Sequence, residues 1–294
     1  MNKKNIKFPD LETIIYESLS MDLVWERYIK KLRESAINVS ETESILFKLY
    51  ASKLEEFLAM KDPEKLKELE QEFHSLKEKL RQLKIIVGMN FRLTRREKDF
   101  IGLNEKTRLF LKMGKPLEKL RDLLGFRIVI CSQERDDLNS IMAAYSVMNN
   151  VLSFFINERN CLLAEAEPLV GIIKDEKEHT ELYIPKESFI FNEFKDNVKD
   201  YILIPKKTGY QGLHAIIRKP NGLVFEIQVR TMAMDIRAEY GSAKHELHKK
   251  DRYEGEFIDI DLSKVNMPGF TVIDNDIVYD TIGLSKSVDP FNLI

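Results

Sequence analysis

The chain has 294 residues, 44% of them hydrophobic, and its formal net charge at pH 7 is −2. This length and composition predict a globular protein with a sizeable core, folded as one large domain or two modest ones. No run of eighteen apolar residues and no secretory leader is present, so we expect a cytoplasmic protein that does not bind membranes. Cys131 and Cys161 lack metal-ligand spacing, which argues for reduced thiols and against a cysteine-bound metal.

The first ninety residues read as helices. Residues 9–36 are expected to form one helix, and Ser40 with Glu43 forms a capping box ahead of a second. Asp62 and Pro63 begin a third, whose apolar residues recur every three or four positions until Gly88. This stripe favours packing against the following domain over a coiled-coil dimer. We therefore predict a helical N-terminal region over residues 1–90.

The middle of the chain mixes helix and strand signals. We expect a short helix over residues 116–124, a buried strand over 125–131 and a helix over 132–156. Residues 157–198 carry no clear pattern, apart from a weak strand signal at 182–184 and a helical or irregular stretch at 193–199. The fold class is α+β.

Residues 199–230 carry the most informative pattern, with apolar runs at 201–205, 213–219 and 223–230. Asn221-Gly222 between the last two runs predicts a type I′ hairpin. Strand alternation then places Glu226, Gln228 and Arg230 on one face. For a half-exposed sheet such a row is often only a solvated surface.

A basic turn precedes this hairpin. It contains Lys206, Lys207, Gly209 and Tyr210, and an exposed aromatic ring beside lysines suits a nucleotide base with its phosphates. A helix is expected from residue 231 to about 250, followed by a tail over 251–294 with a short hairpin around Asn275. The tail holds nine acidic and three basic residues, whereas residues 92–119 hold nine basic and four acidic ones. The basic segment fits a polyphosphate ligand or an ordinary solvated helix face.

These motifs resemble the synthetase domain of the RelA/SpoT alarmone synthetases over about residues 92–250. The matching segments are DYI at 200–202, PK at 205–206, GYQGLH at 209–214, EIQVRT at 226–231 and AEYG at 238–241, followed by Ala243 and His245. Upstream, Arg96, Lys98, Leu103 and Lys106 match one family motif, and Asp122, Gly125 and Arg127 match a second. Two family serines are replaced by Gly102 and Gly212. An insertion is expected over about residues 150–198.

The resemblance implies a nucleotidyltransferase-like synthetase fold, with a mixed and mainly antiparallel sheet flanked by helices. It implies a domain over residues 91–250 that transfers the β,γ-pyrophosphate of ATP to the 3′-hydroxyl of GDP or GTP with Mg²⁺ as cofactor. Asp122 and Glu226 are the implied catalytic residues and metal ligands. The ATP-binding residues are then Arg96, Lys98, Lys106, Arg127 and Arg135, and the acceptor-binding residues are Lys199, Lys206, Tyr210, His214 and Gln228. Glu239 and His245 are expected to support the site.

Two other interpretations stay open. The same site could pyrophosphorylate the 3′ end of tRNA, with Arg92, Arg95, Arg108, Lys112 and Lys115 as further phosphate contacts, or the protein could be a non-catalytic nucleotide sensor. The family's hydrolase module needs a histidine–aspartate metal site, and the N-terminal region offers one histidine, His74, at an exposed position. We therefore expect synthesis without hydrolysis. A homo-oligomer or an antitoxin is a possible partner.

Overall fold

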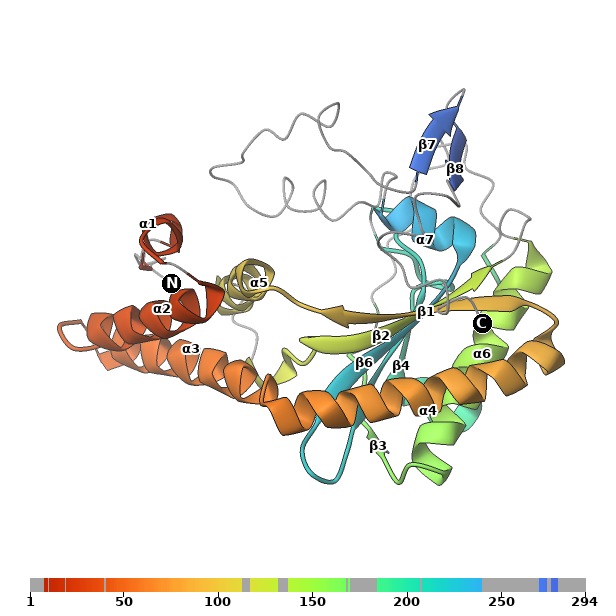
Figure 1. Ribbon diagram of the computed structural model, residues 1–294, viewed down its shortest axis with the longest axis horizontal. Helices are drawn as coiled ribbons and strands as arrows, with labels where there is room; N and C mark the ends of the chain where they lie inside the picture. The colour runs from red at the N-terminus through yellow and green to blue at the C-terminus, as the bar shows by residue number, and fades with distance from the viewer. Residues whose placement is uncertain are drawn as a thin grey trace. The chain divides into compact units, whose positions relative to one another are not determined.

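The computed structural model describes residues 8–9, 11–18, 20–39, 41–112, 117–131, 137–167, 169, 184–206, 208–239, 270–273 and 276–279 (Figure 1). The chain divides into two compact units. The first comprises residues 1–72 and 97–124, and the second comprises residues 73–96 and 125–294.

The first unit is helical. It contains α1 (Leu11–Tyr16), α2 (Met21–Ser35), α3 (Glu41–Met60), the first turns of α4 (Pro63–Val87), α5 (Phe100–Lys112) and the 3₁₀ helix η1 (Leu117–Lys119). Aromatic rings fill its core: those of Trp25 and Phe100 lie 4.5 Å apart, and Tyr28 and Tyr50 are fully buried. The unit therefore has an apolar centre of its own.

Two predictions for this unit were wrong. The single helix expected over residues 9–36 is two helices, because Ser20 has extended backbone and its hydroxyl accepts a hydrogen bond from the Leu23 amide at 3.4 Å, which caps α2. The helix expected over residues 116–124 is only the single turn of η1, so Asp122 lies in an irregular segment. Ser40 lies outside the described residues, as does the side chain of Glu43.

Helix α4 begins and ends as predicted. The Asp62 carboxylate accepts a hydrogen bond from the Glu64 amide at 2.9 Å, and Gly88 has a φ of 71° after the last turn. Of its apolar stripe, Leu76, Leu80 and Leu83 are buried. The stripe therefore packs within the protein, as expected.

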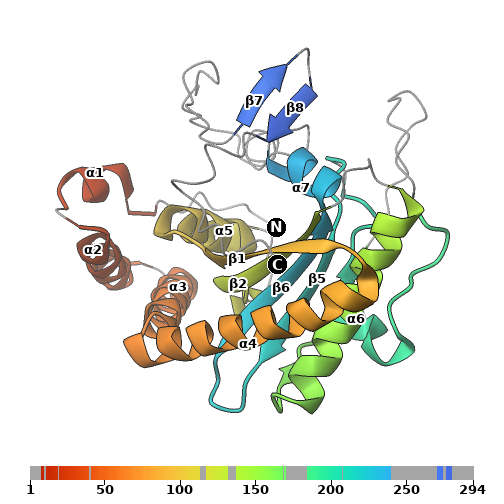
Figure 2. The same ribbon diagram turned by 45° about the vertical axis from the view of Figure 1, so that its right-hand side comes forward.

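The second unit is built on a six-stranded mixed sheet, seen from two directions in Figures 1 and 2. The strand order is β1-β2-β6-β5-β3, and β4 also pairs with β5. Strand β2 runs parallel to β6, while β3, β4 and β6 run antiparallel to β5. The bounds are β1 Asn90–Glu97, β2 Leu124–Cys131, β3 Leu162–Leu163, β4 Val198–Asp200, β5 Leu213–Arg218 and β6 Val224–Thr231. The predicted α+β class with a mainly antiparallel sheet is confirmed.

One face of this sheet is apolar. Phe126 of β2 and Phe225 of β6 have ring centroids 5.2 Å apart, and Phe73 of α4 and Phe155 of α6 (Leu138–Asn157) pack on them. The opposite face carries the polar residues of β2 and β6. Because side chains alternate along a strand, burying one face under α4 and α6 turns Arg127, Glu226 and Gln228 toward the other.

The segment before β5 differs from the prediction. Residues 201–204 form a turn, and the strand that pairs with β5 is β4, three residues earlier. The β5–β6 hairpin is not of type I′, because Gly222 has positive φ and Asn221 does not. Pro220 cannot adopt positive φ, so the loop closes as a longer turn with Gly222 in the left-handed position.

The remaining elements are short. The 3₁₀ helix η2 (Asn192–Asn197) precedes β4, and α7 (Met232–Glu239) follows β6. Strands β7 (Phe270–Ile273) and β8 (Asp276–Tyr279) pair antiparallel, which confirms the hairpin expected around Asn275. Helix α6 begins at residue 138 rather than 132, after the N-cap of Asp137. Within the described residues, no helix is long and apolar enough to cross a membrane.

Candidate functional site

In the first unit, Asp122 lies between two lysines. Lys98 follows β1 and its ammonium lies 3.0 Å from Oδ2 of Asp122, while the ammonium of Lys106 on α5 lies 2.5 Å from the same oxygen. The Lys98 amide also donates to the Leu123 carbonyl at 2.8 Å, which fixes the backbone beside the carboxylate. Three charged residues predicted to share a site are therefore brought together.

The charge state of Asp122 follows from these neighbours. Burial raises the pKa of its carboxyl, but the positive charges of Lys106 and Lys98 outweigh burial and hold the pKa well below its usual range. Asp122 is therefore ionised at neutral pH. The cluster has two positive charges for one negative charge, so it can attract an anion such as a phosphate.

In the second unit, Glu226 is the centre of a hydrogen-bond network. Its Oε1 lies 2.8 Å from Nδ1 of His214 on β5, and its Oε2 accepts a hydrogen bond of 2.5 Å from the side-chain Nε2 of Gln228. The antiparallel register aligns His214 with Gln228 and Ile216 with Glu226. Both oxygens of the carboxylate are thus held by polar side chains of adjacent strands.

The network continues through Tyr210. Its hydroxyl contacts Nε2 of His214 and accepts a hydrogen bond of 2.7 Å from Nη2 of Arg230. The same Arg230 nitrogen lies 3.3 Å from Oε1 of Gln228. The five side chains therefore form a closed ring of hydrogen bonds: Glu226, His214, Tyr210, Arg230 and Gln228.

Chemistry fixes the protons of this ring. An ionised carboxylate only accepts hydrogen bonds and a guanidinium only donates them. Burial lowers the pKa of His214 to about 4, although Glu226 acts in the opposite direction and raises it. The His214 imidazole is therefore neutral at neutral pH. Its Nδ1 then donates to Glu226, and its Nε2 accepts from Tyr210, whose hydroxyl stays protonated because burial raises its pKa. The result is a Glu226 carboxylate held in one orientation.

An ionic cluster supports the ring. Asp235 of α7 pairs with Arg230 at 3.1 Å and with Arg127 at 3.5 Å, and it also contacts Arg92. Glu239 accepts a hydrogen bond of 2.7 Å from Arg127, whose Nε also lies 3.3 Å from Oε1 of Gln228. Burial raises the pKa of Glu239, but the positive charges of Arg127 and Arg230 lower it by more than burial raises it. Glu239 therefore stays ionised.

Two glycines let backbones approach this network. A Cβ on Gly125 would lie 2.8 Å from the Glu226 carbonyl oxygen, so no side chain fits where β2 pairs with β6. Gly212 has a φ of 149°, and its Cβ would lie 3.2 Å from Cγ of Arg230. Gly125 therefore serves the pairing of the strand that carries Glu226, and Gly212 leaves room for Arg230.

A family model described as a region found in RelA / SpoT proteins matches residues 95–253, more than half of the chain. The chain belongs to the RelA/SpoT family. The matched region contains Asp122 with both of its lysines as well as the hydrogen-bonded ring around Glu226.

Curated relatives match parts of this RelA/SpoT chain. It is 27% identical over 165 residues to a guanosine-3′,5′-bis(diphosphate) 3′-pyrophosphohydrolase of Aquifex aeolicus, covering 56% of this chain and 17% of that protein. It is 44% identical over 61 residues to a GTP pyrophosphokinase of Streptomyces antibioticus, covering 21% of this chain and 7% of that one. The chain therefore spans less than a fifth of the length of either relative.

Among solved structures, the small alarmone synthetase 1 of Bacillus subtilis, bound to its product pppGpp, is similar to this chain at 19% identity. The similarity covers 65% of this chain and 79% of that one, with a TM-score of 0.35.

The RelA/SpoT motif residues predicted to bind the acceptor lie in the second unit. Lys206 has its ammonium 4.3 Å from the centroid of the Tyr210 ring and 4.5 Å from that of Tyr201. Lys199 lies on β4 and its ammonium is 3.7 Å from Glu167. The prediction of an exposed Tyr210 was wrong, since only 7% of this residue is accessible and Lys206 and Arg230 both cover its ring.

Some predicted residues cannot be placed. Arg135, Lys207, His245 and the side chain of Lys112 lie outside the described residues. Arg96 lies on β1, where its charge lowers the pKa values of both Arg127 and Glu239 after larger effects of burial and closer charges.

Sequence reasoning gave Arg230, Asp235 and Tyr201 no role. Strand alternation already placed Arg230 on the same face as Glu226 and Gln228, and this alternation is the sequence signal that could have assigned Arg230 to the site. Asp235 and Tyr201 lack such a signal, because their contacts come from α7 and from the turn before β5.

The residues fit a magnesium ion by their chemistry, because carboxylate oxygens are its preferred protein ligands and substrate phosphates commonly complete its coordination. Asp122 in the first unit and Glu226 in the second each offer carboxylate oxygens. Within the described part of the chain, no group of three or more His, Cys, Asp or Glu side chains is placed to hold a metal.

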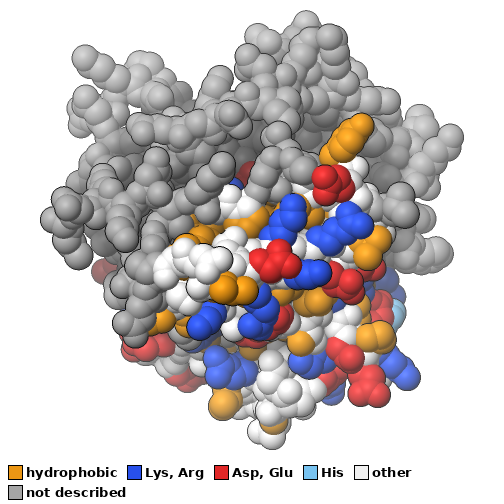
Figure 3. All heavy atoms as spheres, turned by 90° about the vertical axis from the view of Figure 1, so that its left-hand side faces the viewer, with side chains coloured by type: hydrophobic (Ala, Val, Ile, Leu, Met, Phe, Trp, Pro, Cys, Tyr) orange, Lys and Arg blue, Asp and Glu red, His pale blue; other side chains and the backbone are white. Residues whose placement is uncertain are grey.

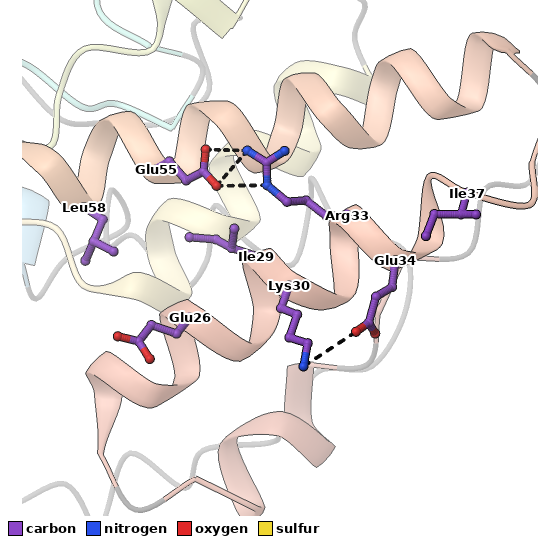
Figure 4. A pocket seen from close by; sticks show the side chains of 8 residues that line it. All are labelled: Glu26, Ile29, Lys30, Arg33, Glu34, Ile37, Glu55 and Leu58. Carbon is purple, nitrogen blue, oxygen red and sulfur yellow. Dashed lines mark hydrogen bonds and ion pairs between the residues drawn. The ribbon is translucent and has the colours of Figure 1, made fainter.

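A shallow groove of about 490 Å³ lies elsewhere, between α2 and α3 of the first unit (Figure 4). Its polar wall is an ion pair in which the Arg33 guanidinium donates to both oxygens of Glu55 at 2.7 to 3.0 Å. None of the predicted site residues lines it. The lining consists of Glu26, Ile29, Lys30, Arg33, Glu34, Ile37, Glu55 and Leu58.

Proposed function

We propose that this RelA/SpoT family member transfers the β,γ-pyrophosphate of ATP to the 3′-hydroxyl of GDP or GTP. The products are (p)ppGpp and AMP. The observation that carries the proposal is the oriented carboxylate of Glu226, which His214 and Gln228 hold within the segment that matches the family. The name of the Streptomyces relative, a GTP pyrophosphokinase, supports the same reaction.

In this proposal Glu226 acts as the general base. It takes the proton of the acceptor's 3′-hydroxyl while the hydroxyl oxygen attacks the β-phosphorus of ATP, and the bond from that phosphorus to the oxygen of the α-phosphate breaks. AMP leaves with the bond's electron pair. His214 and Gln228 would keep the carboxylate in one orientation, and neutral His214 would donate its Nδ1 proton to that carboxylate as a hydrogen bond.

Lys98 and Lys106 would supply positive charge to the triphosphate of ATP, the pyrophosphate donor. Their ammonium groups converge on one oxygen of Asp122, and together they exceed its charge. We assign them to the triphosphate of ATP together with Arg96. Mg²⁺, with Asp122 and Glu226 as candidate ligands, would neutralise charge on the phosphate oxygens.

The acceptor would meet the segment that carries Lys206. This lysine lies over two tyrosine rings, Tyr201 and Tyr210, of which Tyr210 is buried. We therefore assign the acceptor phosphates to Lys206 and Lys199, and give Tyr210 the role of orienting His214.

The test is a transfer assay with γ-³²P-ATP and Mg²⁺, offering GDP, GTP and deacylated tRNA in separate reactions. Label in ppGpp or pppGpp is expected. Glu226→Gln should lower kcat by about a hundredfold or more, the usual contribution of a general base. Glu193→Gln, the same change at an exposed position of η2, should leave the rate unchanged.

Label on tRNA alone would replace the proposal with a tRNA-modifying enzyme. The structure offers that alternative little support at Arg92, whose guanidinium is engaged by the buried Asp235. On the face shown in Figure 3, the described acidic and basic side chains are interleaved rather than gathered by sign. Transfer to none of the acceptors would favour a nucleotide sensor.

A further inference from the structure

Asp200 of β4 is buried, and it accepts hydrogen bonds from three parts of the second unit. The Tyr145 hydroxyl of α6 lies 2.9 Å from Oδ2, and the Ser188 hydroxyl lies 2.5 Å from the same oxygen. The amides of Ile202 and Leu203 donate to Oδ1 at 3.1 and 2.9 Å. The donors are neutral groups from α6, from Ser188 and from the turn after β4. Asp200 therefore joins these three parts of the unit as a hydrogen-bond hub.

Asp200 caps the turn that leads to the acceptor segment. Its side chain accepts the amides two and three residues ahead, and its carbonyl accepts the Ile204 amide at 3.0 Å, which is the pattern of a helix N-cap. The turn carries Tyr201, whose ring lies 5.3 Å from that of His214. Lys206 follows, and its amide donates to the Tyr210 carbonyl at 3.1 Å.

Ser188 belongs to the insertion predicted over about residues 150–198, and its neighbourhood is firmly attached to α6. The side chain of Asn149 donates through Nδ2 to the Phe189 carbonyl at 2.9 Å, and its Oδ1 accepts from the backbone amide of Phe191 at 3.0 Å. The rings of Phe189 and Tyr145 pack edge to face with centroids 5.4 Å apart. The segment over residues 188–191 is thus held against α6, and it places the Ser188 hydroxyl beside Asp200.

We propose that Ser188 is a positioning residue for acceptor binding. Through Asp200 it holds the turn that sets Tyr201 and Lys206 beside His214, so the end of the insertion determines how tightly the acceptor nucleotide binds. This inference rests on the proposed function for its substrate. The contacts that carry it belong to Ser188, Asp200, Tyr145 and the turn over residues 201–204.

The effect of removing the hydroxyl follows from the burial of its partner. Ser188→Ala leaves the buried Asp200 carboxylate with one donor fewer, and a buried polar atom that loses a hydrogen-bond donor is costly. The turn can then compensate only by shifting or by admitting water. Lys98, Lys106 and Asp122, which we assign to ATP, belong to the first unit, so we expect this change in the second unit to leave the KM for ATP unaltered.

The experiment compares Ser188→Ala with the wild type in the transfer assay, varying ATP and the guanine nucleotide separately. We expect the KM for the acceptor to rise about tenfold, with the KM for ATP unchanged. Ser188→Thr keeps the hydroxyl and should restore the acceptor KM. Ser140→Ala is the matched control, because Ser140 is a buried serine on α6 whose hydroxyl has no hydrogen-bond partner among the described residues. An unchanged acceptor KM, or equal rises in both KM values, would overturn the proposal.

A second measurement is independent of activity. Hydrogen–deuterium exchange of the Ile202 and Leu203 amides should be about tenfold faster in Ser188→Ala than in the wild type, and unchanged in Ser140→Ala. Equal exchange in all three proteins would show that Ser188 does not hold the turn. A wild type that transfers no label to GDP or GTP would refute the proposed function, while the exchange rates would still decide the structural coupling.

Discussion

Oε1 of Glu226 lies 2.8 Å from Nδ1 of His214, across two neighbouring antiparallel strands. Both side chains are largely buried, and the other ring nitrogen of His214 contacts the Tyr210 hydroxyl. A buried carboxylate next to a histidine often makes the histidine cationic, but here burial has the larger effect and the imidazole is neutral. The pair is thus a hydrogen bond to a neutral imidazole and not an ion pair with a cationic one.

The low pKa of His214 predicts acid sensitivity of the fold. The pKa is about 4 in the folded protein and about 6.5 in an unfolded chain, so the unfolded state binds the proton first as pH falls. The stability contributed by neutral His214 is complete above pH 6.5 and is lost between there and pH 4, by at most about 3 kcal/mol. Urea unfolding at pH 7 and pH 4.5 should show a smaller difference for His214→Asn than for the wild type. His74→Asn, at an exposed position of α4, should retain the wild-type difference.

Replacing Asp122 should leave two lysines without their shared counter-charge. Asp122→Asn is expected to lower the free energy of unfolding by about 2 kcal/mol, since the pair with Lys106 is partly screened by solvent. Transfer activity should fall by about a hundredfold or more if the residue binds the donor's metal. The measurements are chemical unfolding and the transfer assay.

Asp99→Asn is the matched control for this change. Asp99 is exposed and its carboxylate caps α5 by accepting the Gly102 amide at 2.6 Å, a role that asparagine performs equally well. Equal stability and activity in the two variants would contradict the role given to Asp122.

Restoring the family's serine at position 212 should destabilise the protein. Gly212 has a φ of 149°, and an added Cβ would press on Cγ of Arg230, so we expect Gly212→Ser to cost about 1 to 3 kcal/mol. Gly102→Ser is the comparison. Its Cβ would meet Oδ1 of Asp99 at 3.0 Å, on a side chain that can rotate away, and its φ is not in the positive region. Thermal unfolding should rank the two variants, and the opposite order would show that the loop around Gly212 relaxes without strain.

Local patterns in the sequence determined the elements and part of the site. The Asp62 cap and the Gly88 terminus bounded α4, and the alternation along β6 placed Glu226, Gln228 and Arg230 on one face. The family motifs brought Lys98, Lys106 and Asp122 into one prediction, and their contacts are now observed. Such features depend on residues close in the chain or on strand periodicity, which a sequence displays directly.

Only the tertiary structure decided how the polar residues are used. Tyr210 looked like an exposed ring beside lysines, yet Arg230 from β6 and His214 from β5 draw its hydroxyl into a buried network. Asp235 became a partner of three arginines because α7 folds back on the sheet, and Asp200 became a hub because α6 and the segment around Ser188 converge on it. These contacts join residues far apart in the chain. Burial then sets their protonation, and neither distance nor burial is encoded in any local pattern.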